Sequence, residues 1–352
     1  MSGRNDGRAF IGSFTSAGGR GIIAVTVDAE TGALTEHGVT DALPDPSYLA
    51  LAPDGSVLYA VSETEEGAAA AFRTPAPDAG NGAPRLLGEP VPVCGASPTH
   101  LALTAGHLLT ANYGSGSVTV LPVGPDGAPR PASGVTGHEG SGPHPDRQRG
   151  PHAHQVVTDP SGRWILTTDL GTDSVRISSL DATAGELTPH AETVLRPGTG
   201  PRHLAFHPAG GHAYVLNELE PTLTLCRWDT EKGLLEPVGE APVLPDDVDV
   251  EGFGSEVVVS HDGRFVWAAV RGHDSIVVLA LDATYEKAEL VTAVDCGGRW
   301  PRDLALDPTG GRLYAANEHS GDVTWFDVDP ATGIPVRAGS FAAPAASCVV
   351  FG

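Results

Sequence analysis

Short stretches in which apolar and polar residues alternate recur along the chain, and most are followed by a turn and a second apolar stretch. In one clear copy, residues 47–51 alternate, residues 53–55 read Pro-Asp-Gly, and residues 57–61 are apolar. Alternation with a period of two is typical of β-strands, and Asp-Gly is a common hairpin turn. The pattern therefore predicts a series of antiparallel β-hairpins.

Seven copies of this pattern can be aligned on one position at the start of the first strand. The aligned residues are Tyr48, His100, His154, His203, Glu256, Asp303 and Cys348. Their spacings are 52, 54, 49, 53, 47 and 45 residues, close to the length of one four-stranded propeller blade, roughly 40–50 residues. The repeat predicts an all-β, seven-bladed β-propeller with four-stranded antiparallel blades.

The two ends of the chain complement each other. The seventh copy stops at Gly352 after one strand, and residues 8–27 supply further strands for that blade. Pairing of the N- and C-terminal strands would close the ring and remove its open edges. We expect one propeller domain over residues 8–352 and a flexible tail over residues 1–7. A repeated β-sandwich array is the alternative, but such an array would not require the N- and C-terminal strands to pair.

Composition narrows the class of protein. Although 352 residues often form two domains, large closed all-β folds exceed that size, and 45 Gly and 30 Pro indicate many turns. There is no run of 18 apolar residues, no apolar signal-peptide core near the start, and no Cys-x-x-Cys pair among four cysteines. These features predict a soluble, cytoplasmic protein with free thiols.

The net charge of −23 argues against nucleic acids and anionic membranes as partners. We expect a small-molecule substrate instead. A closed propeller needs no partner surface, so a monomer or a weak homodimer is expected.

Polar residues gather where the propeller would open at one mouth of its central channel. The aligned positions form one ring there, to which Arg202 and Arg302 are adjacent. The ends of the second strands form another ring, composed of Glu63, Asn112, Tyr113, Asp169, Asn217, Glu218, Arg271, Asn317 and Glu318. Convergent acids, bases and arginines in a concave site indicate a binding pocket. The alternative is an ordinary hydrated channel lining.

Several blocks in these rings resemble a known family. They are Gly12-Ser13-Phe14-Thr15, Pro46-Ser47-Tyr48-Leu49, residues 111–118, residues 144–148, Pro151-His152-Ala153-His154, residues 169–173, Gly200-Pro201-Arg202-His203, Asn217-Glu218-Leu219 and residues 262–275. Together, from about Phe10 to Phe351, they look like the lactonase family of seven-bladed propellers. That family includes propeller-type 6-phosphogluconolactonases and the fungal 3-carboxy-cis,cis-muconate lactonizing enzyme.

The resemblance implies reaction on a lactone ring without a cofactor. By motif, the catalytic set falls on His154, Glu218, Arg202 and Arg271. His154 would act as general base or acid with Glu218 as its partner, and the two arginines would bind an anionic substrate. Further substrate-binding candidates around the mouth are His152, Arg147, Gln148, His203, His100, Asp169 and Arg302.

Other chemistries are less well supported. His144, His152 and His154 with Asp169 or Asp173 could hold a divalent metal, but their spacing matches no metal motif, so none is expected. No Gly-x-Ser-x-Gly elbow is present, and the glycine-rich residues 114–117 lack the lysine and helix of a phosphate loop.

Three functions remain open at this point. Hydrolysis of a sugar-derived lactone, most simply 6-phosphogluconolactone, is the leading hypothesis. Cyclisation of an unsaturated diacid, or a lactonase or isomerase step of specialised metabolism, would use the same histidine and arginine set. A non-catalytic binding platform is the third possibility, because a fold does not determine function.

Overall fold

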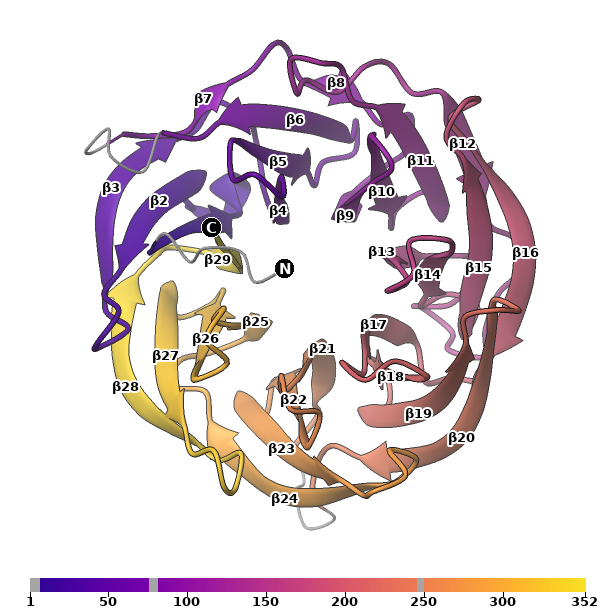
Figure 1. Ribbon diagram of the computed structural model, residues 1–352, viewed down its shortest axis with the longest axis vertical. Helices are drawn as coiled ribbons and strands as arrows, with labels where there is room; N and C mark the ends of the chain where they lie inside the picture. Colours follow the sequence, from indigo (N-terminus) through magenta and orange to yellow (C-terminus); the bar gives the residue numbers. More distant parts are fainter. Residues whose placement is uncertain (1–6, 76–81, 246–249) are drawn as a thin grey trace.

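The computed structural model describes residues 7–75, 82–245 and 250–352. Within these ranges the strands form seven antiparallel sheets arranged as blades around a central axis (Figure 1). The predicted seven-bladed propeller is therefore confirmed. The predicted flexible tail falls on residues 1–6, which lie outside the described residues, and on Gly7, whose carbonyl accepts a hydrogen bond from Val27 N–H.

Blades 1 to 4 follow one another in sequence, each beginning with its innermost strand. Blade 1 consists of β4 (Leu49–Leu51), β5 (Val57–Ser62), β6 (Ala68–Arg73) and β7 (Arg85–Leu86), and β8 (Val91–Pro92) also pairs with β6. Blade 2 consists of β9 (Pro98–Thr104), β10 (His107–Asn112), β11 (Ser117–Pro122) and β12 (Gly134–Gly137). Blade 3 consists of β13 (Ala153–Thr158), β14 (Ile165–Asp169), β15 (Ser174–Asp181) and β16 (Glu186–Val194). Blade 4 consists of β17 (Pro201–Phe206), β18 (His212–Asn217), β19 (Thr222–Asp229) and β20 (Leu234–Pro242).

Blades 5 and 6 repeat this order, and blade 7 combines the two ends of the chain. Blade 5 consists of β21 (Phe253–Val259), β22 (Phe265–Arg271), β23 (Ser275–Leu281) and β24 (Ala288–Asp295). Blade 6 consists of β25 (Pro301–Leu306), β26 (Arg312–Asn317), β27 (Asp322–Val328) and β28 (Pro335–Ala342). Blade 7 consists of β29 (Ala346–Phe351), β1 (Arg8–Ser13), β2 (Ile22–Val27) and β3 (Leu34–Thr40).

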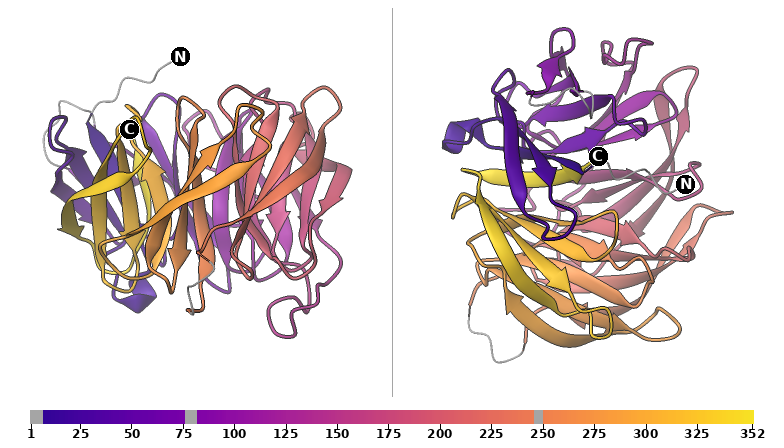
Figure 2. Two further views of the ribbon diagram at one scale, coloured as in Figure 1. Left: turned by 90° about the horizontal axis from the view of Figure 1, so that it is seen from below. Right: turned by 60° about the vertical axis from the view of Figure 1, so that its left-hand side comes forward.

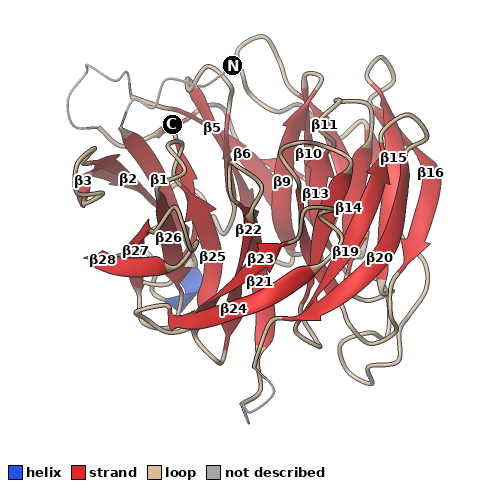
Figure 3. Ribbon diagram, turned by 60° about the horizontal axis from the view of Figure 1, so that its bottom comes forward, coloured by secondary structure: helices blue, strands red, loops and turns tan. Residues whose placement is uncertain are grey.

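Blade 7 closes the ring as the sequence predicts. Strand β29 pairs with β1 in antiparallel register, with Phe10 opposite Val350 and Ile11 opposite Val349. The molecule is a disc when seen from the side, with strands running between its two faces (Figure 2). The only helix in the described chain is the short 3₁₀ turn η1 (Thr15–Ala17) (Figure 3), and no helix there is long and apolar enough to cross a membrane.

The core lies between the blades. Strands β5 and β22 are buried along their whole length, whereas every residue of the outer strand β16 is exposed or half-buried. Turns between the third and fourth strands seal one blade against the next: Trp267 donates its indole N–H to Gly333 O at 2.7 Å. Gly333 has a φ of +70°, and a Cβ there would lie 2.5 Å from the Phe265 ring. Glycine is therefore required at this contact.

Candidate active site

Six of the seven innermost strands bulge near their start, at the mouth of the channel predicted to hold the site. His154 is unpaired between Ala153 opposite Asp169 and Gln155 opposite Thr168. Arg202 and Arg302 occupy the same extra position in β17 and β25. A β-bulge re-aims a side chain, and bulges are common beside active sites.

This register corrects the sequence alignment at blade 3. The alignment placed His154 in line with His203, but the strand pairing places Gln155 at the position of His203. His154 corresponds to Arg202 and Arg302 instead. One extra residue in a bulge does not change the apolar pattern, so the sequence does not reveal it. Because both blades carry a histidine near this position, aligning His154 with His203 gives a register shifted by one residue.

Three arginines surround Glu218, which follows β18. Its Oε2 lies 2.8 Å from Arg271 Nη2 and 3.2 Å from Arg202 Nε, and its Oε1 lies 2.5 Å from Arg147 Nη2. Glu218, Arg202 and Arg271 are buried, and Arg147 is about one-third exposed. The structure thus brings together four of the predicted site residues, from blades 4 and 5 and the loop before β13.

The charges of these groups are strongly coupled. Burial alone would raise the pKa of Glu218, but the positive charges of Arg271, Arg202 and Arg147 outweigh it and lower the pKa to about 2. Burial is also the main cause that lowers the pKa of Arg202 to about 9, with Arg271 adding to it. Glu218 is therefore a carboxylate, and Arg202 a cation, at neutral pH.

Arg302 belongs to a second charged group at the same mouth. Its Nη2 lies 3.2 Å from Glu63 Oε1 and its Nη1 lies 3.5 Å from Glu318 Oε2. Its guanidinium carbon lies 4.7 Å from the centre of the Phe14 ring, which is a cation–π distance. The predicted proximity of Arg302 to the mouth is therefore seen, but two glutamates already partner it.

Three histidines lie close together in the ring, and two of them, His100 and His203, lie against Tyr48. The His203 ring lies 5.1 Å from that of His154 and 5.5 Å from that of His100, and the His100 ring lies 4.0 Å from that of Tyr48. Burial, followed by neighbouring positive charge, holds the pKa of each histidine well below its usual range. All three imidazoles are therefore neutral at pH 7.

Among the described residues, one of these histidines contacts an acid. His203 Nδ1 lies 2.7 Å from Glu256 Oε2, and Glu256 in turn hydrogen-bonds the side chain of Asp303. No hydrogen bond joins His154 to Glu218 among the residues that the structure describes. Its Nδ1 is buried without a partner there. The predicted His154–Glu218 pair therefore has no hydrogen bond or ion pair in the described chain.

Four residues that the sequence predicts for the site lie in or beside the loops around the channel mouth. Arg147 donates to the Tyr113 hydroxyl at 3.2 Å, and His152 stacks on the Tyr113 ring with 4.3 Å between centroids. Gln148 is buried and donates to Leu170 O and Asp173 Oδ1. Asp169 accepts the backbone N–H of His152 and lies 2.6 Å from His138 Nδ1. Gln148 and Asp169 therefore hold loops.

Two residues at this mouth escaped the sequence analysis. His138 contacts Asp169, and the ring of Trp300 lies 5.5 Å from the Arg271 guanidinium carbon. Trp300 also has a φ of +64°, which is rare for a bulky residue. Its position just before the repeated Pro-Arg pair was the available signal, but neither contact can be derived from spacing.

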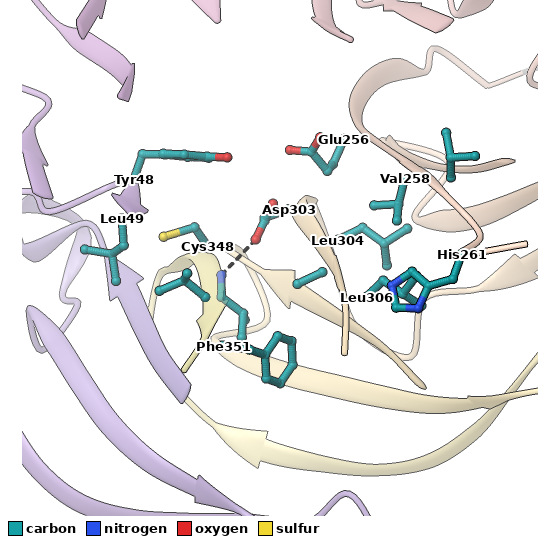
Figure 4. Close-up of a pocket in the computed structure, with 14 residues that line it drawn as sticks. Tyr48, Leu49, Glu256, Val258, His261, Asp303, Leu304, Leu306, Cys348 and Phe351 are labelled. Atoms are coloured by element: carbon teal, nitrogen blue, oxygen red, sulfur yellow. Dashed lines mark hydrogen bonds between the residues drawn. The ribbon is translucent and has the colours of Figure 1, made fainter. Parts of the chain in front are cut away.

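Two cavities flank the His203–Glu256–Asp303 group. A small one of about 10 Å³ is lined by residues that include Tyr48, Arg202, His203, Glu256 and Arg302. A larger one of about 430 Å³ is lined by Tyr48, Glu256 and Asp303 together with apolar residues of the innermost strands (Figure 4). Within the described ranges, no three histidine, cysteine, aspartate or glutamate side chains are arranged to hold a metal ion.

Comparison with known proteins agrees with this architecture. The family model described as "Lactonase, 7-bladed beta-propeller" matches residues 8–351. The 6-phosphogluconolactonase of Bacillus subtilis (strain 168) is 34% identical over 346 residues, covering 97% of each chain. The periplasmic gluconolactonase structure from Pseudomonas aeruginosa has a TM-score of 0.91 at 28% identity and covers 98% of both chains. A Lactobacillus plantarum protein structure also has a TM-score of 0.91, at 29% identity, covering 98% of this chain and 99% of that one. The chain therefore belongs to the lactonase family of seven-bladed β-propellers.

Proposed function

We propose that the protein hydrolyses a sugar-derived lactone, and that the substrate is 6-phosphogluconolactone, which it converts to 6-phosphogluconate. The observation that carries this proposal is the convergence of Arg147, Arg202 and Arg271 beside neutral histidines at one mouth of the channel. The names of the Bacillus and Pseudomonas relatives support the same class of substrate.

The arginines suit an anionic lactone. A guanidinium presents two parallel N–H donors to a phosphate or carboxylate and keeps its charge when it is buried. Positive charge in a site with little water also stabilises the carbonyl oxygen as it becomes anionic during attack. Glu218 balances the buried arginines in the free protein, so they remain in place before the substrate arrives.

The histidines suit the proton transfers. Lactone opening requires a base that removes a proton from water and a group that returns a proton to the leaving ring oxygen. A neutral imidazole can accept a proton at physiological pH, and His154 is the base that the family resemblance implies. Glu218, bound to three guanidinium groups, serves in this proposal to hold the arginines.

The test is an assay with two lactones. Purified protein would be given freshly generated 6-phosphoglucono-δ-lactone or unphosphorylated glucono-δ-lactone, with an uncatalysed blank for each. We expect rapid opening of the phosphorylated lactone. Arg271→Gln should lower kcat/KM for it by about 10- to 100-fold, because a hydrogen bond to a charged group contributes roughly 1.5–3 kcal/mol.

The matched control is Arg149→Gln, since Arg149 is exposed and its contacts in the described chain are an ion pair with Asp146 and a hydrogen bond to Pro145 O. It should leave both rates unchanged. If neither lactone opens faster than in the blank, hydrolysis is wrong, and the cycloisomerase or binding-platform hypothesis takes its place.

A further inference from the structure

One histidine of the central group differs from the others because a carboxylate orients its ring. His203 Nδ1 lies 2.7 Å from Glu256 Oε2, whereas His100 and His154 each have a buried Nδ1 without a hydrogen-bond partner in the described chain. An imidazole held by a carboxylate at one nitrogen presents the other nitrogen in a defined tautomer and direction.

The charge state of Glu256 follows from its neighbours. Its Oε1 accepts the Val257 N–H at 3.0 Å, and its side chain hydrogen-bonds Asp303, which accepts the Val349 N–H at 2.8 Å. Figure 4 shows the two carboxyl groups at one side of the larger cavity, with Tyr48 across from them. Two carboxyl groups in contact must share a proton.

That proton resides on Asp303. Burial raises the pKa of Asp303 well above its usual range, and Glu256 raises it further. Burial also raises the pKa of Glu256, to about 7, while Arg202 and the hydrogen bond from Asp303 act in the opposite direction. The charged and titratable groups facing Glu256 are thus His203, Arg202, Asp303 and Tyr48. Asp303 donates to Glu256, which is left as the acceptor for His203 Nδ1–H.

The hydrogen bonds from Asp303 through Glu256 to His203 Nδ1 leave the other ring nitrogen of His203, Nε2, at the end of the chain. With Nδ1 protonated, Nε2 carries the lone pair, and it is buried without a partner in the part of the chain described here. His203 also lines the cavity of about 10 Å³, along with Ser47 and Ser347. A polar cavity of this size has room for about one water molecule.

We infer that His203, oriented by Glu256, is the general base that takes a proton from the water attacking the lactone. This inference rests on the proposed function and identifies which histidine of the site performs the proton transfer. Glu256 is a positioning residue, and Asp303 keeps it in place. His154, at the bulge beside the arginines, binds the substrate.

The step balances without a further reactant. The water oxygen bonds to the lactone carbonyl carbon while one of its protons moves to His203 Nε2. The ring carbon–oxygen bond then breaks, and the proton on Nε2 moves to the leaving oxygen. The product is a hydroxy acid, which ionises and releases one proton to solvent.

The test compares His203→Asn with His154→Gln on 6-phosphoglucono-δ-lactone. We expect His203→Asn to lower kcat by about 10²-fold or more with little change in KM, because a positioned base contributes 10²–10⁴-fold. His154→Gln should mainly raise KM. The control is His261→Asn, since His261 lines the larger cavity (Figure 4) but not the small cavity that His203 lines.

A second readout does not depend on how well the His203 variant folds. The wild-type rate should fall below about pH 7 as Glu256 becomes protonated, and Glu256→Gln should lower kcat and abolish that dependence. Near wild-type kcat in a folded His203→Asn protein, or an acidic limb that persists in Glu256→Gln, would overturn the assignment. Absence of hydrolysis by the wild-type protein is a different result, and it would overturn the proposed function.

Discussion

Two glutamates buried in neighbouring blades have pKa values that are shifted in opposite directions. Glu218, at the end of β18, contacts three guanidinium groups, and its pKa falls to about 2. Glu256, near the start of β21, contacts a neutral histidine and a second carboxyl group, and its pKa rises to about 7. Burial is similar, with 3% and 7% of each residue exposed. The partners therefore decide which glutamate holds charge and which responds to pH.

This difference separates two tasks within one ring. The carboxylate of Glu218 neutralises arginines that would otherwise repel one another in the folded protein. The carboxyl group of Glu256 is poised near neutral pH, where a small change in environment alters its proton occupancy. The substrate-binding and proton-transfer parts of the proposed mechanism are thus built from the same residue type in adjacent blades.

The largest expected effect is on stability. Glu218→Gln should lower the free energy of unfolding by about 3 kcal/mol, because it leaves buried guanidinium charges without their carboxylate. Glu256→Gln should cost about 1 kcal/mol or less at pH 7, since that group is already partly protonated. Urea unfolding of both variants measures the contrast. Equal losses would mean that the two glutamates are not electrostatically distinct.

The second expected effect is a pH dependence that belongs to one glutamate only. Because the pKa of Glu256 is raised to about 7, its ionised form is lost as the pH falls below 7, and kcat should fall about tenfold per pH unit. Glu218 stays ionised down to about pH 2, so its protonation does not change kcat between pH 5 and pH 9. A profile of kcat from pH 5 to pH 9 checks this. A flat profile between pH 5 and pH 7 would contradict it.

A smaller effect should come from the arginine at the rim of the Glu218 group. Arg147→Gln should lower kcat/KM roughly tenfold for the phosphorylated lactone and less than about twofold for glucono-δ-lactone, because only the former carries a phosphate. Measuring both substrates on one protein preparation controls for folding. Equal losses on the two lactones would place the phosphate elsewhere.

The smallest effect should come from an arginine only two residues away. Arg149→Gln removes an exposed pair with Asp146, and such pairs contribute roughly 0–1 kcal/mol. Thermal unfolding and both lactone rates should therefore match those of the wild-type protein. A large loss in this variant would show that charge near the mouth acts at long range rather than through the contacts of Glu218.

The fold could be predicted because its signals are local and repeated. Hairpin alternation, Asp-Gly turns and a period of 45–54 residues gave the number of blades, and the unfinished last copy gave the closure by β29 and β1. The bulges could not be predicted, because one extra residue changes the direction of a side chain without changing the apolar pattern. This is why His154 was aligned with His203 rather than with Arg202.

The site could be predicted in its residue types and ring order but not in its pairings. The aligned ring already placed His203, Glu256 and Asp303 in consecutive blades. Which carboxylate contacts which base depends on distances between side chains that are far apart in sequence, such as His203 and Glu256, which are 53 residues apart. The family resemblance suggested Glu218 as the partner of a histidine, whereas its contacts are with three arginines.

The most direct test of the account is a crystal structure with bound 6-phosphogluconate, the product of the proposed reaction. The account predicts the phosphate on Arg147, Arg202 or Arg271, with the carboxylate carbon beside the group formed by His154 and His203. A ligand bound instead in the larger cavity of about 430 Å³, lined by Asp303 and apolar residues of the innermost strands, would contradict it.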